Sequence, residues 1–168
     1  MIARYFPAIV LTLTVLSAPA IAGFKTWTAE VEDDPFSGNS QVTVEYAMSV
    51  RSGVLVMCSG LSMHIKVVPG YEYTGKQPMQ GELKIAVDGS VLEFTDDPVL
   101  SAGSVGQNLN AIEAVFDFEN ARLVAKAFSG AKKQIAIKDT MSDQPILLKA
   151  TGSTVAFNSM LSKCLKDG

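Results

Sequence analysis

Side chains that could carry out chemistry are few in this sequence of 168 residues. The only histidine is His64, and the only cysteines are Cys58 and Cys164. A Ser-His-Asp arrangement would need His64 as its base, yet His64 lies in an alternating apolar pattern with no nucleophile motif nearby. Neither cysteine has a second cysteine or a histidine at the short spacings typical of zinc sites. We therefore predict a protein that is not an enzyme and that holds no metal and no cofactor, with His64 as a partly exposed strand residue.

Two pairs of adjacent carboxylates, Asp33-Asp34 and Asp96-Asp97, each precede a proline. Two carboxyl groups can serve glycoside hydrolysis or hold a calcium ion. Adjacent side chains point apart, however, and Asp and Pro are typical turn residues. We interpret both pairs as turns, and a wall hydrolase that uses one of them is the least favoured class of function. Residues 103–106 lack the Lys-Ser/Thr pair of a phosphate-binding loop and are predicted to be an ordinary loop.

Aromatic side chains beside loops are the stronger candidates for binding, because they can anchor a protein partner. Trp27 alternates in phase with neighbouring apolar residues, which predicts a place in the core. Phe36, Tyr71 and Tyr73 lie in segments without a regular pattern. The sequence therefore predicts Phe36, Tyr71 and Tyr73 as residues that contact a protein partner.

The N-terminal residues have the three parts of a secretory signal peptide. Arg4 precedes an apolar run from Phe6 to Leu16, and Ala20-Ile21-Ala22 follows as a processing site. We expect residues 1–22 to be the signal peptide and residues 23–168 to form one domain that is periplasmic or secreted. The apolar run is too short to span a bilayer, and no other stretch is long enough. No membrane span is expected once the signal is removed.

Charge and export limit the partners of this domain. Without Arg4 the chain has 14 − 1 = 13 basic residues against 17 acidic ones and no basic cluster. This balance argues against nucleic acid and anionic lipid as partners and favours a protein partner. An exported chain meets oxidising conditions, so we predict a disulfide between Cys58 and Cys164.

Period-2 alternation predicts β-strands over residues 25–31, 41–50 and 61–67, and the apolar run of residues 54–58 predicts a buried central strand. Residues 133–139 and 145–150 are predicted to be two more strands. Asp88-Gly89 between apolar runs predicts a hairpin within residues 82–94. Residues 69–81 are predicted to be a loop or an irregular strand, and residues 96–108 are dominated by turn formers.

Two helices are predicted in the second half of the chain. Residues 120–128 form the first, which Gly130 can end, and Ser153 or Thr154 can cap the second. The apolar face of the first would carry Leu123, Val124, Ala127 and Phe128, and that of the second Val155, Phe157, Met160, Leu161 and Cys164. The predicted fold class is mainly β with α: an antiparallel, β-sandwich-like single domain with an internal helix and a C-terminal helix tied by one disulfide.

The order of these features resembles the VasI-like family of exported proteins associated with type VI secretion. The resemblance covers most of residues 23–168. Its pieces are Asp33-Asp34 before an alternating strand, Leu55-Val56-Met57-Cys58, the helix of residues 123–128 leading into Ile135-Ala136-Ile137, and the ending of residues 152–164. The chain departs from the family at Met57, where arginine is usual, and at Pro35, where serine is usual. A second resemblance is to the periplasmic proteins of the invasion-associated locus B type.

The first resemblance implies an accessory role in a secretion or cell-envelope system and supplies no catalytic residues. We therefore expect a non-catalytic periplasmic or secreted protein that acts through protein-protein contact. An inhibitor of a lysozyme-like cell-wall hydrolase is the alternative, since small exported β domains with disulfides often block enzymes with a loop.

Overall fold

The computed structural model describes residues 24–33, 35–36, 40–60, 62–75, 82–139 and 144–166. The expected signal peptide, residues 1–22, lies outside the described residues. None of the helices in the described ranges is long and apolar enough to cross a membrane. The elements are β1 (Trp27–Asp33), β2 (Ser40–Ser49), β3 (Ser52–Ser59), β4 (Ser62–Val68), β5 (Leu83–Val87), β6 (Ser90–Val91), β7 (Val99–Val105), β8 (Leu109–Phe116), α1 (Phe118–Gly130), β9 (Gln134–Asp139), β10 (Ile146–Lys149) and α2 (Ser153–Lys163).

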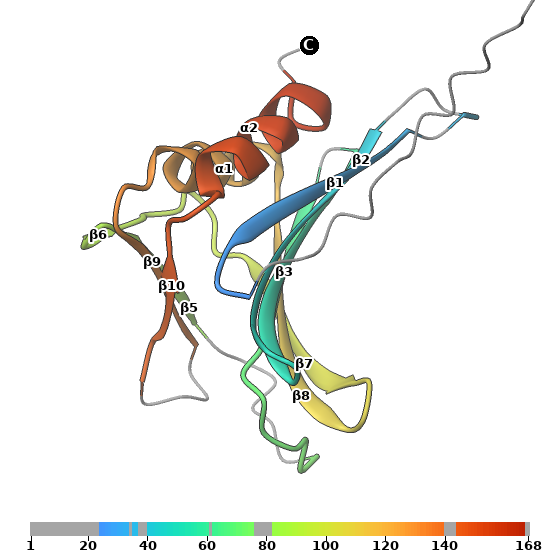
Figure 1. The fold of residues 1–168 in the computed structure, drawn as a ribbon, viewed down its shortest axis with the longest axis vertical. Helices are drawn as coiled ribbons and strands as arrows, with labels where there is room; N and C mark the ends of the chain where they lie inside the picture. Colours follow the sequence, from blue (N-terminus) through green and yellow to red (C-terminus); the bar gives the residue numbers. More distant parts are fainter. Residues whose placement is uncertain are drawn as a thin grey trace, which may run out of the picture.

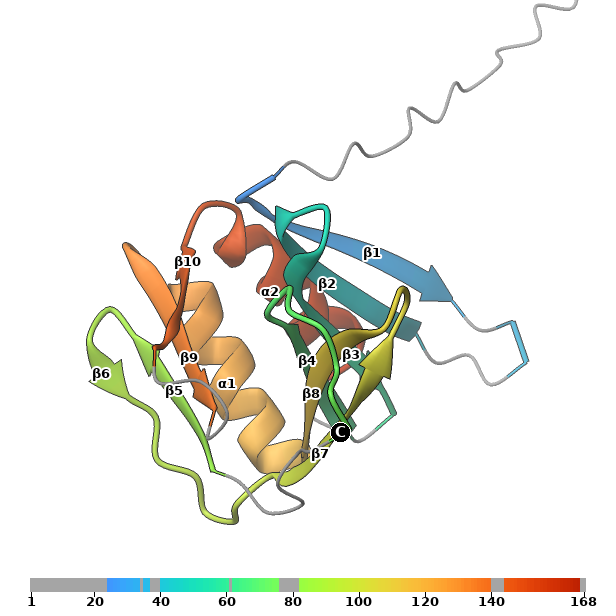
Figure 2. The ribbon, with the colours of Figure 1, turned by 90° about the horizontal axis from the view of Figure 1, so that it is seen from below.

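The strands form two antiparallel sheets that lie opposite each other (Figure 1). The larger sheet has the order β1-β2-β3-β4-β8-β7, and the smaller has the order β10-β9-β5-β6. The two helices pack against each other and cover one end of the space between the sheets. Seen from below, α1 lies between the sheets (Figure 2). The predicted fold class, a mainly β antiparallel domain with two helices and one disulfide, is confirmed.

The core is built from alternate residues of the strands, because successive side chains of a strand point to opposite faces. In β3, Val54, Val56 and Cys58 are buried on the inner face. Leu55 and Met57 point to the outer face and are half-buried. The six-stranded sheet therefore has one face in the core and one face that is only partly covered.

The indole of Trp27 lies where the two sheets and the two helices meet. Its ring centroid is 5.0 Å from that of Tyr46, 6.0 Å from that of Phe128 and 5.2 Å from that of Phe157. The indole N–H donates to the carbonyl oxygen of Lys149 at 3.0 Å, and the backbone N–H of Lys149 donates to the Tyr46 hydroxyl at 3.1 Å. The predicted place of Trp27 in the core is confirmed, and these hydrogen bonds join β1 and β2 to β10.

The predicted disulfide between Cys58 and Cys164 is present, and the two Cα atoms are 6.2 Å apart. Cys58 is near the end of β3, and Cys164 is the residue that caps the C-terminus of α2. Leu165, which follows, is buried. The bond therefore fixes the end of the last helix to the six-stranded sheet.

The predicted hairpin turn at Asp88-Gly89 joins β5 to β6. Both residues have positive φ, 52° and 92°, as a two-residue turn of this type requires. The Asp88 carboxylate also accepts the backbone N–H groups of Lys132, Lys133 and Gln134 at 2.7, 2.8 and 2.9 Å. These hydrogen bonds lower the pKa of Asp88, and the bond from Gln134 has the largest effect. They also join the turn to the connection between α1 and β9.

The interpretation of residues 103–106 as a loop is wrong, because residues 103–105 belong to strand β7. Strand β8 was not predicted either. β8 buries Ile112, Ala114 and Phe116 on its inner face and pairs with β4 and β7. Pairing with a well-packed neighbour holds the serines and glycine of β7 in a strand despite their low strand propensity.

The predicted helix phases are correct only in part. In α1 the buried face carries Ala121, Val124, Ala125 and Phe128, whereas Leu123 is exposed. The helix begins earlier than predicted, because the Asp117 side chain caps it by accepting the backbone N–H of Asn120 at 2.9 Å.

In α2 the capping residue is Gly152, not Ser153 or Thr154. Thr154 instead donates its hydroxyl to the carbonyl oxygen of Ser129 at 2.8 Å. Val155, predicted on the apolar face, is 75% exposed, because docking of Phe157 and Met160 in the core turns it outward. The packing partners, which the sequence does not reveal, set the rotation of both helices.

Replacing Gly152 by alanine should destabilise the fold. Gly152 has a φ of 84°, and a Cβ at this position would overlap the carbonyl oxygen of Trp27. We expect urea denaturation to show a loss of about 2–4 kcal/mol in the free energy of unfolding. Gly130→Ala is the matched control, since its Cβ would meet no atom within 4 Å, and its effect should stay within about 1 kcal/mol. Equal losses in both variants would contradict this account of the turn.

Replacing Cys164 by serine should cost about 2–5 kcal/mol, the usual range for a disulfide in a small exported domain. The substitution frees the C-terminal end of α2 from β3. Chemical denaturation of Cys164→Ser, with reduced wild type as the control, measures this loss, and the two samples should agree. Labelling of two thiols on unfolded, unreduced wild type would show that the bond is absent in solution.

Candidate binding surface

The outer face of the six-stranded sheet carries a row of side chains that combines apolar and charged groups. The register places Glu45 opposite Leu55, Leu55 opposite Lys66, and Lys66 opposite Glu113. Because these residues occupy the positions that alternate with the core, they point away from it. All four are half-buried, so neighbouring side chains cover each of them in part.

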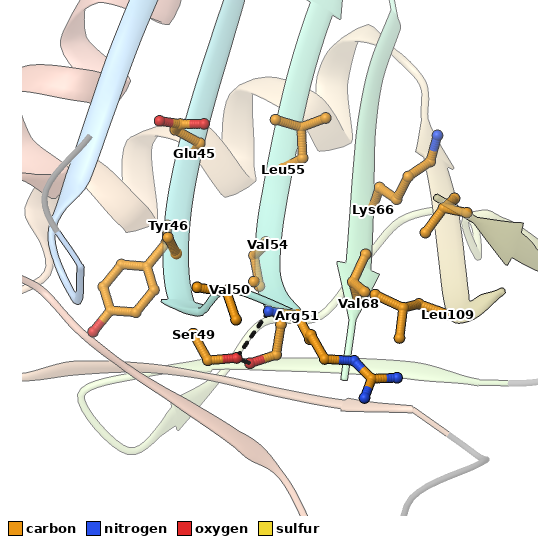
Figure 3. Close-up of a pocket in the computed structure, with 14 residues that line it drawn as sticks. Glu45, Tyr46, Ser49, Val50, Arg51, Val54, Leu55, Lys66, Val68 and Leu109 are labelled. Carbon is orange, nitrogen blue, oxygen red and sulfur yellow. Dashed lines mark hydrogen bonds between the residues drawn. The ribbon is translucent and has the colours of Figure 1, made fainter. Parts of the chain in front are cut away.

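A hollow of about 390 Å³ opens on this face beside the turn between β2 and β3 (Figure 3). Val50 in this turn is 90% exposed. The turn is held by a hydrogen bond of 2.7 Å between the hydroxyls of Ser49 and Ser52 and by the backbone N–H of Arg51, which donates to Ser49 at 3.1 Å. We call this hollow the outer-face hollow; its apolar lining includes Val50, Leu55, Val68, Val105 and Leu109, and its charged lining Glu45, Arg51 and Lys66.

A second, smaller hollow of about 180 Å³ lies next to the first. It is lined by residues 101–105 of β7, by Lys66, and by Ala111 and Glu113 of β8. The two hollows share Lys66 and Val105. They form a surface that crosses the sheet from the turn at Val50 to the edge strand β7.

Glu113 is the electrostatic centre of this surface. Its carboxylate accepts a hydrogen bond from Nδ1 of His64 at 2.9 Å, and its other oxygen is 3.6 Å from Nζ of Lys66. The hydrogen bond of His64 lowers the pKa of Glu113, partial burial opposes this, and the charge of Lys66 adds to the lowering. His64 lies opposite Met57 on β3 and opposite Val115 on β8, whereas Glu113 lies opposite Lys66 on β4 and Ser101 on β7. The interpretation of His64 as a partly exposed strand residue is confirmed.

The predicted aromatic candidates do not lie together. Phe36 is 98% exposed in the connection between β1 and β2. Tyr71 and Tyr73 follow β4. The C-terminal end of β4 pairs with β3 next to the turn between β2 and β3, and this turn is at the opposite end of the sheet from Phe36. The backbone of this segment pairs with β8: the N–H of Asn110 donates to the carbonyl oxygen of Tyr71, and the N–H of Tyr73 donates to that of Asn108, both at 2.9 Å. Residues 69–75, predicted to be part of a loop or an irregular strand, thus form a connection with one isolated β-bridge, between Glu72 and Leu109, while residues 76–81 lie outside the described residues.

Tyr71 is 42% exposed, and partial burial raises the pKa of its hydroxyl. A hydrogen bond with Asn110 lowers this pKa, and the negative charge of Asp139 raises it. Both Asn110 and Asp139 are buried. Tyr71 therefore takes part in a polar cluster at the margin of the core, and a role of Phe36, Tyr71 and Tyr73 in partner binding stays a prediction.

The interpretation of the acidic pairs as turns holds for Asp96-Asp97 and is wrong for Asp33, which belongs to strand β1 and pairs with Ser40. Asp33 ends β1 and accepts the hydroxyl of Ser40 at 2.8 Å, while Asp34 is outside the described residues. Asp96 and Asp97 are exposed between β6 and β7. Within the described ranges, no group of three or more His, Cys, Asp or Glu side chains is placed to hold a metal ion.

Sequence reasoning missed the residues of the outer-face hollow. A signal was present in β3, where Val54, Leu55, Val56, Met57 and Cys58 form an unbroken apolar run. Such a run is typical of a strand that is covered on both faces, whereas a strand with one wet face alternates. Comparison of the chain with family models, with curated proteins and with solved structures found no match.

Replacing Glu113 by glutamine should remove stability in a pH-dependent way. The pKa of Glu113 in the folded protein is lower than its usual value of 4.5, so ionised Glu113 stabilises the fold above that pH. At pH 7 we expect Glu113→Gln to cost about 0.5–1 kcal/mol. The difference from wild type should shrink as the pH falls through the folded pKa, because wild-type Glu113 then becomes protonated.

Denaturation curves at pH 7 and at pH 3 measure this effect. Glu30→Gln is the control, because it removes a carboxylate from the exposed part of β1. Its effect should be small at both values. A loss for Glu113→Gln that is equal at pH 7 and pH 3 would show that the Glu113 charge does not stabilise the sheet.

Proposed function

We propose that the protein is an exported, non-catalytic protein that binds another protein through the outer face of its six-stranded sheet. The observation that supports this proposal is that β3 is apolar on both faces. Its inner residues form the core, while Leu55 and Met57 on the outer face are only half-buried in the single chain. A partner that covers the outer face would complete the burial that such a strand favours.

The outer-face hollow matches the chemistry of a protein partner. Its apolar walls and its volume of about 390 Å³ suit one or two large apolar side chains of that partner as anchors. Its rim carries both signs of charge, with Glu45 on one side and Arg51 and Lys66 on the other. An apolar centre surrounded by a polar rim is the usual anatomy of a protein interface.

The proposed location is the periplasm or the extracellular medium. The signal-peptide features of residues 1–22 support export. The disulfide between Cys58 and Cys164 supports an oxidising compartment, because such bonds persist there and are rare in the cytosol.

Within this class, the proposed role is that of an accessory of a secretion or cell-envelope system, as the resemblance to the VasI-like family implies. The alternative role is inhibition of a lysozyme-like cell-wall hydrolase. The turn between β2 and β3 favours this alternative, because Val50 and Arg51 are exposed at its tip and could enter the cleft of an enzyme.

Site-specific photo-crosslinking in cells that express the chain tests the proposal. A photoreactive amino acid at position 50 should yield an adduct with one protein, because this position lies in the wall of the outer-face hollow. The same amino acid at position 155 is the control, since Val155 is exposed on α2, away from the hollow. Mass spectrometry of the adduct separates a component of a secretion or envelope machine from a hydrolase.

With the partner identified, Val50→Asp should weaken binding at least about tenfold, and Val155→Asp should leave it unchanged. Both valines are exposed, so both variants should keep the melting temperature of the wild type. Adducts at both positions or at neither would contradict the proposed surface. Hydrolysis of cell-wall material by the purified chain in a zymogram would contradict a non-catalytic function.

A further inference from the structure

The two sheets end in four edge strands, and three of them carry features that prevent pairing with another chain. An edge strand exposes unpaired backbone N–H and C=O groups, and proteins protect such edges with charged residues or by keeping them short. β1 carries Glu30, Glu32 and Asp33. β6 has two residues, and β10 has four and carries Lys149.

β7 is the unprotected edge. It is seven residues long, Val99 to Val105, and none of its side chains is charged. Among the described residues it pairs with β8 alone, and it lies at the margin of the six-stranded sheet (Figure 1). Val99 at its start is exposed, and a Cβ at Gly103 would meet no atom within 4 Å. Nothing in the described ranges covers this edge.

We propose that β7 pairs antiparallel with β7 of a second copy of this chain, with Ala102 opposite Ala102. The register then places Val99 opposite Val105 and Ser101 opposite Gly103 of the second copy. The pairing is isologous, because each chain offers the same strand to the other, so it closes into a dimer. The two six-stranded sheets would join into one continuous sheet.

The charges favour a second copy as the occupant. No like charges meet within the paired strands, and each end gains an apolar cross-strand pair of valines. The turn of residues 106–108, which follows β7, carries no charged side chain either, so no charge lies directly beyond Val105. Self-pairing of β1 would instead bring Glu30, Glu32 and Asp33 close to their copies.

The dimer would also place the two smaller hollows side by side, because residues 101–105 line the hollow that adjoins β7. This inference does not depend on the proposed function, since it rests on the edge strand alone. A strand of seven residues buries less surface than a standard interface, so we expect a dissociation constant between about 10 µM and 1 mM.

Sedimentation velocity of the chain without its signal peptide, measured across that range of concentrations, tests the proposal. The wild type should shift from the mass of a monomer to that of a dimer. The double variant Ser101→Lys and Gly103→Lys should remain a monomer throughout, because the new lysines would lie directly opposite each other across the dimer. The double variant should still fold. Ser101 is exposed and lies opposite Glu113 on β8, whose negative charge suits a lysine, and a Cβ at position 103 would meet open space. Circular dichroism and the melting temperature check this.

Two further samples make the test specific to β7. The variant Gly103→Glu leaves the position opposite Glu113 unchanged, and an equal mixture with the lysine variant should form a heterodimer, because position 103 of one chain lies opposite position 101 of the other. The double variant Val91→Lys and Leu147→Lys adds the same charge on exposed positions of the other sheet and should dimerise like the wild type. A wild type that stays monomeric at every concentration would overturn the proposal. A dimer that persists in the lysine variant would also overturn it, because that dimer would use another surface.

Discussion

Burial of the Trp27 indole is the interaction on which the arrangement of the two sheets depends. The ring packs on Tyr46 of the large sheet and on Phe128 and Phe157 of the helices, and its N–H binds the end of β10 in the small sheet. A smaller side chain would leave a cavity among four elements and a carbonyl oxygen without its donor, and both effects destabilise a core. Gly152, at the start of α2, lies so close to the Trp27 carbonyl oxygen that a Cβ there would overlap it. The start of α2 therefore packs directly against the backbone of Trp27.

Strand β3 is anchored at both ends, and its outward-facing residues lie between the two anchors. At one end Val54 lies opposite Tyr46, which contacts Trp27. At the other end Cys58 is bonded to the last helix. Leu55 and Met57 lie between these two points and face outward. A surface that is already fixed before binding loses little conformational entropy when a partner docks, which favours affinity.

Local chemistry made part of the fold predictable, and tertiary contacts decided the rest. Asp88-Gly89 predicted its hairpin because that pair favours positive φ, and a chain with two cysteines allows only one intramolecular disulfide. The serines and glycine of β7 gave no such signal, since their strand exists through pairing with β8. The residues of the outer-face hollow were less predictable than the fold. Leu55 is apolar like its buried neighbours, so its outward direction appears only when the sheet is assembled.

Exposed apolar residues on and beside the large sheet, such as Val50 and Val99, bury little surface in the single chain. Val50 is exposed, so it adds little of the roughly 25 cal/mol that each Å² of buried apolar surface contributes. Exposed apolar patches and bare edges also promote association. The chain protects β1 with three carboxylates, yet β7 carries no charge at all. The unprotected edge strand β7 adjoins the partly covered outer face of the large sheet, because Lys66 and Val105 line both hollows. The proposed function and the proposed dimer would give both features one explanation, contact with other protein chains.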